Sequence, residues 1–328
     1  MTINVALCAW GMSGREFHLP LIEAEPRLHL TTLLRRSGPD GSEPEGVTFV
    51  HDLKAILDDP AIELVVVNTP NELHFRMASA ALAAGKHVVL EKPITITLED
   101  AHTLTKQARD AGRILAVFHN RRLDADYLTL KRHLESGDIG DLVELEWHYD
   151  RYRAHVTQKQ WKEDNLPGAG TWFDLGIHLV DGMLNLFGPP LSVTADMDSL
   201  RRPGAATDYF DVRFRYPDHR VLLRGSTFVR ELGPAIIAHG KKGSLIIPHD
   251  SAQAKGEPPT ALLHTERDGK VVRERVPLEP ARHQDFYANV TAAIAGDQPL
   301  LFTPENATAA LAIIHRAIEA AGVRGMGI

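Results

Sequence analysis

Short apolar runs alternate with helical patterns through the first ~120 residues, and this order constrains the fold more than any other feature. It is typical of βαβ units, which build a parallel sheet with helices on its faces. The apolar runs are short and continuous, as strands buried on both faces are. We expect strands over Ile3–Cys8, Leu28–Leu34, Val47–Val50, Leu64–Val67, His87–Leu90 and Ile114–Phe118.

A different pattern follows residue 122. Val143–Trp147 alternates apolar and charged residues, which predicts a strand with one wet face. Further alternating runs lie between Ser192 and Arg275 and suit an antiparallel meander. Helices are expected over Asp124–Ser136, Trp172–Phe187, Gln284–Ala295 and Pro304–Ala321. The sequence therefore predicts an α/β protein, with a doubly wound parallel sheet in a domain over 1–122 and an α+β domain with a mostly antiparallel sheet over 123–328.

Composition narrows the class of protein. The 328 residues carry a formal net charge of −7, with 44% hydrophobic and 24% charged residues. These values exclude wholesale disorder and argue against a basic nucleic-acid-binding face. The single cysteine, Cys8, permits no intrachain disulfide, and no histidine spacing suits a metal site. Without a basic leader or an apolar run of ~18 residues, we expect a cytoplasmic protein with no membrane partner.

A glycine-rich turn follows the first expected strand and opens a helix. It reads Ala9-Trp10-Gly11-Met12-Ser13-Gly14, close to the dinucleotide fingerprint G-x-G-x-x-G. Gly11 would let backbone approach a pyrophosphate, and Gly14 would permit close packing of helix on strand. Ala9 replaces the first glycine, which restricts positive φ at that position.

The end of the second strand indicates which cofactor is preferred. An acidic residue there binds the 2′-hydroxyl of NAD. Leu33–Ser37 contains no carboxylate but offers Arg35, Arg36 and Ser37. An arginine pair holds the 2′-phosphate of NADP with charge-assisted bonds, so NADP is predicted, with NAD possible. A solvated basic turn is the alternative interpretation. The Gly-, Pro- and Ser-rich loop Ser37–Glu45 is expected to be a surface connection.

Three further motifs complete the picture. Glu91-Lys92-Pro93 follows the fifth strand, Asn68–His74 follows the fourth, and Gly168–His178 leads into the helix over Trp172–Phe187. Together with the glycine loop they resemble the Gfo/Idh/MocA oxidoreductase family over essentially the whole chain. The resemblance implies an N-terminal Rossmann domain and a C-terminal α+β substrate domain. His119–Arg122 resembles a subset of NADP-linked enzymes acting on inositols and related polyols or sugars.

The chemistry of alcohol oxidation suits three of these residues. Lys92 lies at the carboxyl end of a strand, where an ammonium can stabilise developing alkoxide charge. Asp174 and His178 have i, i+4 spacing on one helix face, and histidine exchanges protons near neutral pH. The resemblance implies the same catalytic roles for Lys92, Asp174 and His178. The cofactor-binding set implied is Ala9, Gly11, Met12, Ser13, Gly14, Arg35, Arg36, Ser37, Thr69, Pro70, Asn71, His74, Glu91, Lys92 and Asn120.

The sequence leaves some interpretations open. Arg151, Tyr152, Arg153 and Trp161 form either a substrate wall or a solvated loop, and Asp208 and Tyr209 open a strand that can reach the pocket. The leading function is an NADP-dependent oxidoreductase of a cyclic polyol or sugar alcohol or ketone. An NAD-dependent glycoside hydrolase and a non-catalytic nucleotide sensor are the alternatives. The resemblance also implies a homo-oligomer, a dimer or tetramer.

Overall fold

The computed structural model describes residues 2–35, 38, 41–155, 164–202, 204–249 and 258–322. The chain divides into two compact units. The first contains Met1–Asn120 together with Arg282–Leu311, and the second contains Arg121–Ala281 with the residues from Ala312 onward. The division falls inside the long helix α9 (Pro304–Ala321).

The described part of the first unit holds a six-stranded sheet in the order β3-β2-β1-β4-β5-β6. Every neighbouring pair is parallel. The order reverses between β1 and β4, which is where doubly wound sheets bind nucleotides. The predicted doubly wound parallel sheet is therefore confirmed. Its strands are β1 (Ile3–Leu7), β2 (Leu28–Leu34), β3 (Thr48–Val50), β4 (Leu64–Val67), β5 (His87–Leu90) and β6 (Leu115–Val117).

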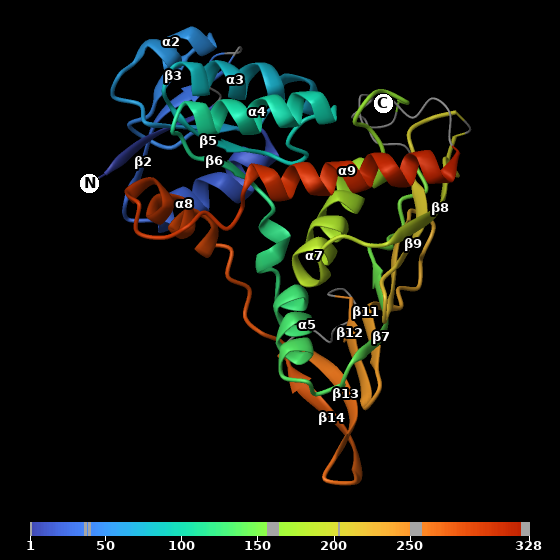
Figure 1. Cartoon of the computed structure of the whole chain (residues 1–328). Helices are drawn as coiled ribbons and strands as arrows, with labels where there is room; N and C mark the ends of the chain where they lie inside the picture. The colour runs from blue at the N-terminus through green and yellow to red at the C-terminus, as the bar shows by residue number, and fades with distance from the viewer. Residues whose placement is uncertain are drawn as a thin grey trace. The chain divides into compact units, whose positions relative to one another are not determined.

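Helices flank this sheet, and α3 (His74–Ala83) and α4 (Leu98–Asp110) run side by side (Figure 1). The N-cap of α4 is Thr97, whose side chain accepts a hydrogen bond from the Asp100 amide. The other helical segments before residue 120 are the π-helical turn η1 (Gly14–His18), α1 (Leu19–Ala24), α2 (Leu53–Asp58) and the 3₁₀ turn η2 (Asn71–Leu73).

Residues Arg282–Leu311 join the first unit because aromatic side chains anchor them there. The Phe286 ring of α8 (Asp285–Ala295) meets the Phe118 ring edge-on at 4.7 Å. The amide of Val117 in β6 donates to the Phe302 carbonyl at 3.0 Å. A distant segment thus closes the edge of the sheet at β6, which periodicity along the chain does not predict.

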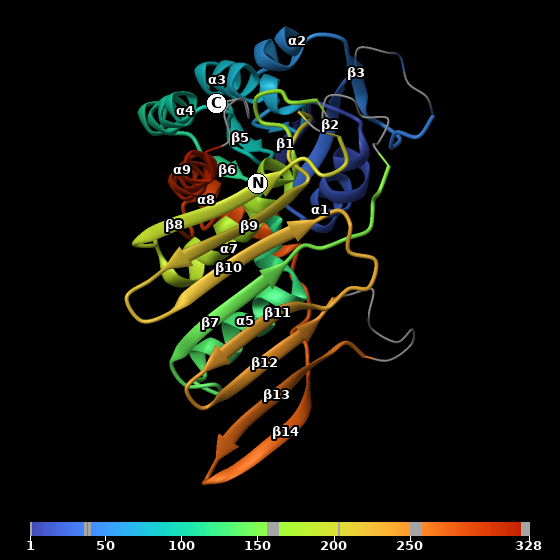
Figure 2. The same cartoon turned by 90° about the vertical axis from the view of Figure 1, so that its right-hand side faces the viewer.

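The described part of the second unit contains an eight-stranded sheet in the order β14-β13-β12-β11-β7-β10-β9-β8 (Figure 2). Its neighbours are antiparallel except the β7–β10 pair, which is parallel. The mostly antiparallel sheet is confirmed, but the single meander expected from Ser192 to Arg275 is interrupted, because β7 inserts between β10 and β11. The strands are β7 (Leu142–His148), β8 (Ser192–Asp198), β9 (Tyr209–Arg215), β10 (Arg220–Ser226), β11 (Pro234–Gly240), β12 (Gly243–Pro248), β13 (Thr260–Arg267) and β14 (Lys270–Pro277).

Helices α5 (Ala125–Glu135) and α7 (Ile177–Phe187) cover one face of this sheet (Figure 2). Trp147 of β7 stacks on the Tyr127 ring of α5 with centroids 6.1 Å apart. A Cβ atom at Gly182 of α7 would lie 2.7 Å from the Trp147 ring, so glycine is needed for this close approach. Over the described ranges, no helix has the length and apolar character that a membrane crossing requires.

Candidate active site

The glycine loop of the first unit is clamped by Asn68, which follows β4. The Ala9 amide donates to Asn68 Oδ1 at 2.9 Å, and Asn68 Nδ2 donates to the Ala9 carbonyl at 2.9 Å. Ala9 does not need positive φ, since Asp268 is the one non-glycine residue with positive φ in the described ranges. Alanine therefore fits where the fingerprint has its first glycine, and Asn68 holds the loop from the side.

The two remaining glycines of the loop have different surroundings. A Cβ atom at Gly14 would lie 2.6 Å from the Ala9 carbonyl oxygen, so the helix start packs directly on the loop. A Cβ atom at Gly11 would meet no atom within 4 Å. Thr69 follows Asn68, the residue that bonds Ala9, and its Oγ1 is buried with no hydrogen-bond partner among the described residues. The open backbone at Gly11 and the orphaned hydroxyl of Thr69 suit the pyrophosphate of a dinucleotide.

Glu91 ties the turn after β5 to the glycine loop. Its Oε1 accepts a hydrogen bond from the Ser13 hydroxyl and lies 3.3 Å from His18 Nε2, and its Oε2 accepts from the Lys92 amide at 3.2 Å. Burial by itself raises the pKa of Glu91. The hydrogen bond and charge of His18, the Ser13 bond and the Lys92 charge outweigh it and lower the pKa to about 2. Glu91 is therefore a carboxylate that fixes the backbone of Lys92 beside the loop.

Two buried histidines support the same turn. His18 Nδ1 lies 2.8 Å from the Tyr287 hydroxyl of α8, on the other side of the ring from Glu91. His74 places Nδ1 2.8 Å from the Pro93 carbonyl and Nε2 2.9 Å from the Thr69 carbonyl. His74 is fully buried, and this burial lowers its pKa. Its ring nitrogens face these two backbone carbonyls and so link the turn after β5 to the turn after β4, and cofactor contact by His74 stays a prediction.

The other predicted residues of the first unit lie around this turn. Lys92 is half-buried and joined to Pro93 by a cis peptide bond. His119, which follows β6, is buried, and Asn120 beside it is half-buried. Met12 is exposed in the glycine loop, Pro70 is exposed, and Asn71 is half-buried at the start of η2. Cys8 is buried, which raises the pKa of its thiol to about 12 and makes it unreactive.

The carboxyl end of β2 differs from its expected surroundings. Arg35 forms an ion pair with Glu43, a carboxylate that the window Leu33–Ser37 does not contain. The Glu43 side chain is 3% exposed, so the loop expected to be a plain surface connection buries one acidic side chain. Ser42, next to Glu43, also accepts a hydrogen bond from the Trp10 indole at 2.9 Å. Arg36 and Ser37 lie outside the described residues.

In the second unit, the predicted catalytic helix begins with the π-helical turn η4 (Trp172–Gly176) and continues as α7. Thr171 anchors its start through two bonds to the Thr207 carbonyl, from its amide at 2.6 Å and its hydroxyl at 3.0 Å. Asp174 is half-buried in η4, and His178 is 8% exposed in α7. The structure thus places both side chains in the first turns of one helix.

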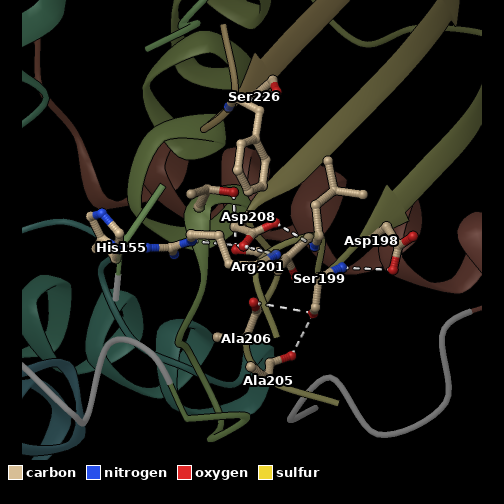
Figure 3. A network of polar contacts seen from close by, with 12 residues as sticks. His155, Asp198, Ser199, Arg201, Ala205, Ala206, Asp208 and Ser226 are labelled. Atoms are coloured by element: carbon tan, nitrogen blue, oxygen red, sulfur yellow. Dashed lines mark hydrogen bonds and ion pairs between the residues drawn. The ribbon is translucent and has the colours of Figure 1, made fainter. Parts of the chain in front are cut away.

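Asp208 organises the loop that holds this helix start (Figure 3). Its carboxylate accepts hydrogen bonds from the Leu200 amide at 2.7 Å and from the Arg201 amide and Nε at 3.0 and 2.8 Å. The Ser199 hydroxyl, in the same loop, donates to the Ala205 carbonyl at 2.6 Å. Asp208 precedes β9 and is 2% exposed. Its partners make it an anchor of the loop, and through Thr207 the loop holds the helix start.

Arg122 fixes the same helix from its middle. Its Nε and second guanidinium nitrogen donate to the two oxygens of Asp181 at 2.7 and 2.6 Å. Both side chains are nearly buried, at 8% and 3% exposed. Asp181 lies three residues after His178, so this bidentate pair orients the helix face that carries the histidine. The sequence signal for it was the arginine pair after β6, whose acidic partner is distant in the chain.

Residues Arg151 to Arg153, at the start of the polar stretch before Gly168, pair with the end of β10 and the residue after it. The amides of Arg151 and Arg153 donate to the Ser226 and Thr227 carbonyls at 2.9 and 2.8 Å. Tyr152 is 43% exposed, and the guanidinium of Arg230 lies 3.8 Å from its ring centroid. These contacts extend the sheet, and the substrate wall stays a prediction. Trp161 lies outside the described residues.

Two family models together match nearly the whole chain. The model described as oxidoreductase family, NAD-binding Rossmann fold, matches residues 3–119. The model described as oxidoreductase family, C-terminal alpha/beta domain, matches residues 131–325. Both carry the name GFO_IDH_MocA.

Individual relatives agree along the same length. The chain is 37% identical to the uncharacterized oxidoreductase YdgJ of Escherichia coli K12, covering 97% of this chain and 96% of that one. It is 33% identical to the scyllo-inositol 2-dehydrogenase (NADP(+)) IolW of Bacillus subtilis, covering 97% and 93%. The solved structure of YPO2259 from Yersinia pestis superposes with a TM-score of 0.90 at 34% identity, covering 98% and 95%.

Proposed function

Because this chain belongs to the Gfo/Idh/MocA oxidoreductase family, we propose that it is an NADP-dependent enzyme that interconverts a secondary alcohol and a ketone. Its substrate class is a cyclic polyol, inositol-like, or a sugar. The family assignment makes it an oxidoreductase with an NAD-binding Rossmann domain. The preference for NADP and the substrate class are the parts we propose here.

One observation within the first unit carries the reaction type. The Ser13 hydroxyl of the glycine loop bonds the carboxylate of Glu91, which also accepts the Lys92 amide. The backbone of Lys92, whose side chain carries an ammonium group, is therefore fixed beside the loop that suits a dinucleotide. A cation near the reacting carbon assists hydride transfer, because negative charge develops on the substrate oxygen as the hydroxyl proton leaves.

Each predicted catalytic residue then receives one role. Lys92 donates a hydrogen bond to the substrate oxygen and stabilises the developing alkoxide. His178 accepts the hydroxyl proton during oxidation and returns it during reduction. Asp174 binds a neighbouring substrate hydroxyl. The nicotinamide, when bound, supplies the hydride acceptor or donor, and Ala9, Gly11, Gly14 and Thr69 hold the dinucleotide.

The cofactor preference rests on Arg35. Its guanidinium lies at the carboxyl end of β2, where the adenosine ribose is recognised in this fold. A planar guanidinium binds a phosphate through paired charge-assisted bonds, which a 2′-hydroxyl cannot match. The relative IolW carries NADP(+) in its name, which supports the same preference.

The substrate class rests on that relative and on the side chains of the second unit. IolW is named as a dehydrogenase of scyllo-inositol. A ring bearing several hydroxyls needs several polar partners, and Asp174 and His178 in adjacent turns supply two. An inositol-like ring or a sugar suits such a helix better than an apolar alcohol does.

The test follows nicotinamide absorbance with inositols, sugars and their keto forms, each with NADP and with NAD. We expect turnover with at least one cyclic polyol or sugar, and a higher kcat/KM with NADP. Replacing Arg35 by Ala should weaken binding of NADP and leave binding of NAD nearly unchanged. Equal kcat/KM for the two cofactors would refute the preference, and turnover of simple acyclic alcohols in place of every ring substrate would refute the substrate class.

A further inference from the structure

Arg35 is already paired with an anion that belongs to this chain. The Glu43 carboxylate contacts its guanidinium, and the two side chains are 3% and 12% exposed. The pair is therefore shielded from solvent, where attraction between charges is stronger than at an open surface. The guanidinium that we assign to the cofactor phosphate therefore already pairs with the Glu43 carboxylate.

Both partners are held in place by their own surroundings. The Arg35 amide donates to the Val50 carbonyl at 2.9 Å, and its carbonyl faces His51 Nδ1 at 2.9 Å. Glu43 Oε2 accepts the Gly41 amide at 2.9 Å. The carboxylate is thus orientated by its own loop, so its position against Arg35 does not depend on chance rotation of an exposed side chain.

A second contact links this loop to the nucleotide loop. The Trp10 indole, which lies between Ala9 and Gly11, donates to the Ser42 hydroxyl at 2.9 Å. Ser42 is the neighbour of Glu43 in sequence. Movement of Glu43 away from Arg35 therefore affects the hydrogen bond of Trp10, in the segment that the dinucleotide would contact.

From this geometry we propose that Glu43 is an internal competitor of the 2′-phosphate, and that it sets how strongly the protein discriminates NADP from NAD. The inference rests on the proposed use of NADP. A phosphate that binds Arg35 must first displace the carboxylate, so its apparent affinity falls by the fraction of molecules in which Arg35 is available. A ligand with a 2′-hydroxyl needs no such displacement and escapes this cost.

The experiment measures binding of two adenosine fragments by calorimetry, without turnover. Adenosine 2′,5′-bisphosphate carries the 2′-phosphate, and adenosine 5′-monophosphate lacks it. Glu43→Gln keeps the size of the side chain and removes its charge. We expect the variant to bind the bisphosphate about tenfold more tightly, equal to about 1.4 kcal/mol, and the monophosphate within about twofold of the parent.

Glu45→Gln is the matched control. Glu45 lies two residues further along the same loop and is exposed. The control removes the same charge and leaves the Arg35–Glu43 pair intact, so it reports the general effect of net charge. Unchanged or weaker binding of the bisphosphate in Glu43→Gln, or the same tightening in Glu45→Gln, would overturn the competitor role.

Arg35→Ala separates this inference from the proposed function. If Arg35→Ala binds the bisphosphate as tightly as the parent protein does, Arg35 does not bind the 2′-phosphate, and the proposed NADP preference is wrong. If Arg35→Ala weakens binding of the bisphosphate but Glu43→Gln does not tighten it, only the competitor role of Glu43 is wrong.

Tryptophan emission of the parent protein gives a second measurement should Glu43→Gln fail to fold. Trp10 is the one tryptophan in the first unit. We expect the bisphosphate to change its emission more than the monophosphate does, since only the former displaces Glu43 and disturbs the Trp10–Ser42 hydrogen bond. Equal emission changes with both fragments would contradict displacement.

Discussion

Replacing Gly14 and Gly11 separately by Ala should split folding from cofactor binding. The Gly14 Cβ would lie 2.6 Å from the Ala9 carbonyl oxygen, and that carbonyl is held by Asn68, so the loop has little freedom to retreat. Overpacking of this kind costs about 1–3 kcal/mol. The better helix propensity of Ala returns up to about 1 kcal/mol, so the middle of that range, about 2 kcal/mol, becomes a net loss of about 1–2 kcal/mol.

Thermal unfolding tests this magnitude. At about 2–4 °C per kcal/mol, Gly14→Ala should lower the Tm of the first unit by about 2–8 °C. Gly11→Ala should leave Tm unchanged, because its Cβ meets no atom within 4 Å. Calorimetry should instead find weaker NADP binding in Gly11→Ala, by about tenfold or 1.4 kcal/mol, if the pyrophosphate approaches that backbone. A Gly14→Ala protein as stable as the parent would refute the packing argument, and unchanged NADP affinity in Gly11→Ala would refute the placement of the pyrophosphate.

Three further variants test other parts of the proposal. Lys92→Ala should lower turnover by about 10²-fold or more with NADP binding retained, and steady-state kinetics with near-normal turnover would remove Lys92 from the chemistry. His178→Ala should lower turnover by about 10²–10⁴-fold in both alcohol oxidation and ketone reduction. In the parent, oxidation should rise with pH as the imidazole becomes neutral and reduction should fall, and a variant that keeps this pH profile would show that another group titrates. Because the pKa of Glu91 is lowered from 4.5 to about 2, its carboxylate stabilises the fold above about pH 4.5 and loses this effect as pH falls toward 2. Urea unfolding at several pH values should show that the free energy of unfolding of Glu91→Gln falls less steeply below pH 4.5 than that of the parent. The same pH dependence in both proteins would refute the lowered pKa of Glu91.

The strands of the first unit could be predicted closely because each is a short apolar run between polar residues. Leu64–Val67 and His87–Leu90 have the predicted limits. Helix α2 was not predicted, since its six residues are too few for a periodic pattern. The sequence limits of the helices over Asp285–Ala295 and Pro304–Ala321 were close to their predictions. The contact of Phe286 in α8 with Phe118, which follows β6, joins segments far apart in the chain and could not be predicted.

The polar groups that hold the candidate site were harder to predict. Glu43, Asp181 and Asp208 are single acidic residues outside any motif. Each forms an ion pair with an arginine that the fold brings next to it. Arg35 and Arg122 stand in motifs that the sequence shows, whereas Glu43 and Asp181, their partners, do not. Local sequence indicates where a charge lies, whereas pairing is a property of the tertiary structure.

Two of the helical segments that carry predicted site residues begin with a π-helical turn. These turns are Gly14–His18 after the glycine loop and Trp172–Gly176 after Gly170. The i, i+4 spacing of Asp174 and His178 places both on one face only in a regular α-helix. A π turn takes one more residue per hydrogen-bonded ring, so Asp174 is rotated relative to that expectation.

The cause of the second π turn lies in tertiary packing. A Cβ atom at Gly176 would lie 2.1 Å from the Trp172 ring, so the indole folds over the glycine backbone. The Trp172 indole nitrogen also donates to the Ile314 carbonyl of α9 at 3.1 Å, which fixes the ring. The extra residue is thus accommodated where Trp172 is anchored, and His178 follows in regular α-helix. The direction of His178 is therefore set by the bidentate Arg122–Asp181 pair and the α-helix that contains it, while that of Asp174 depends on the Trp172 anchor.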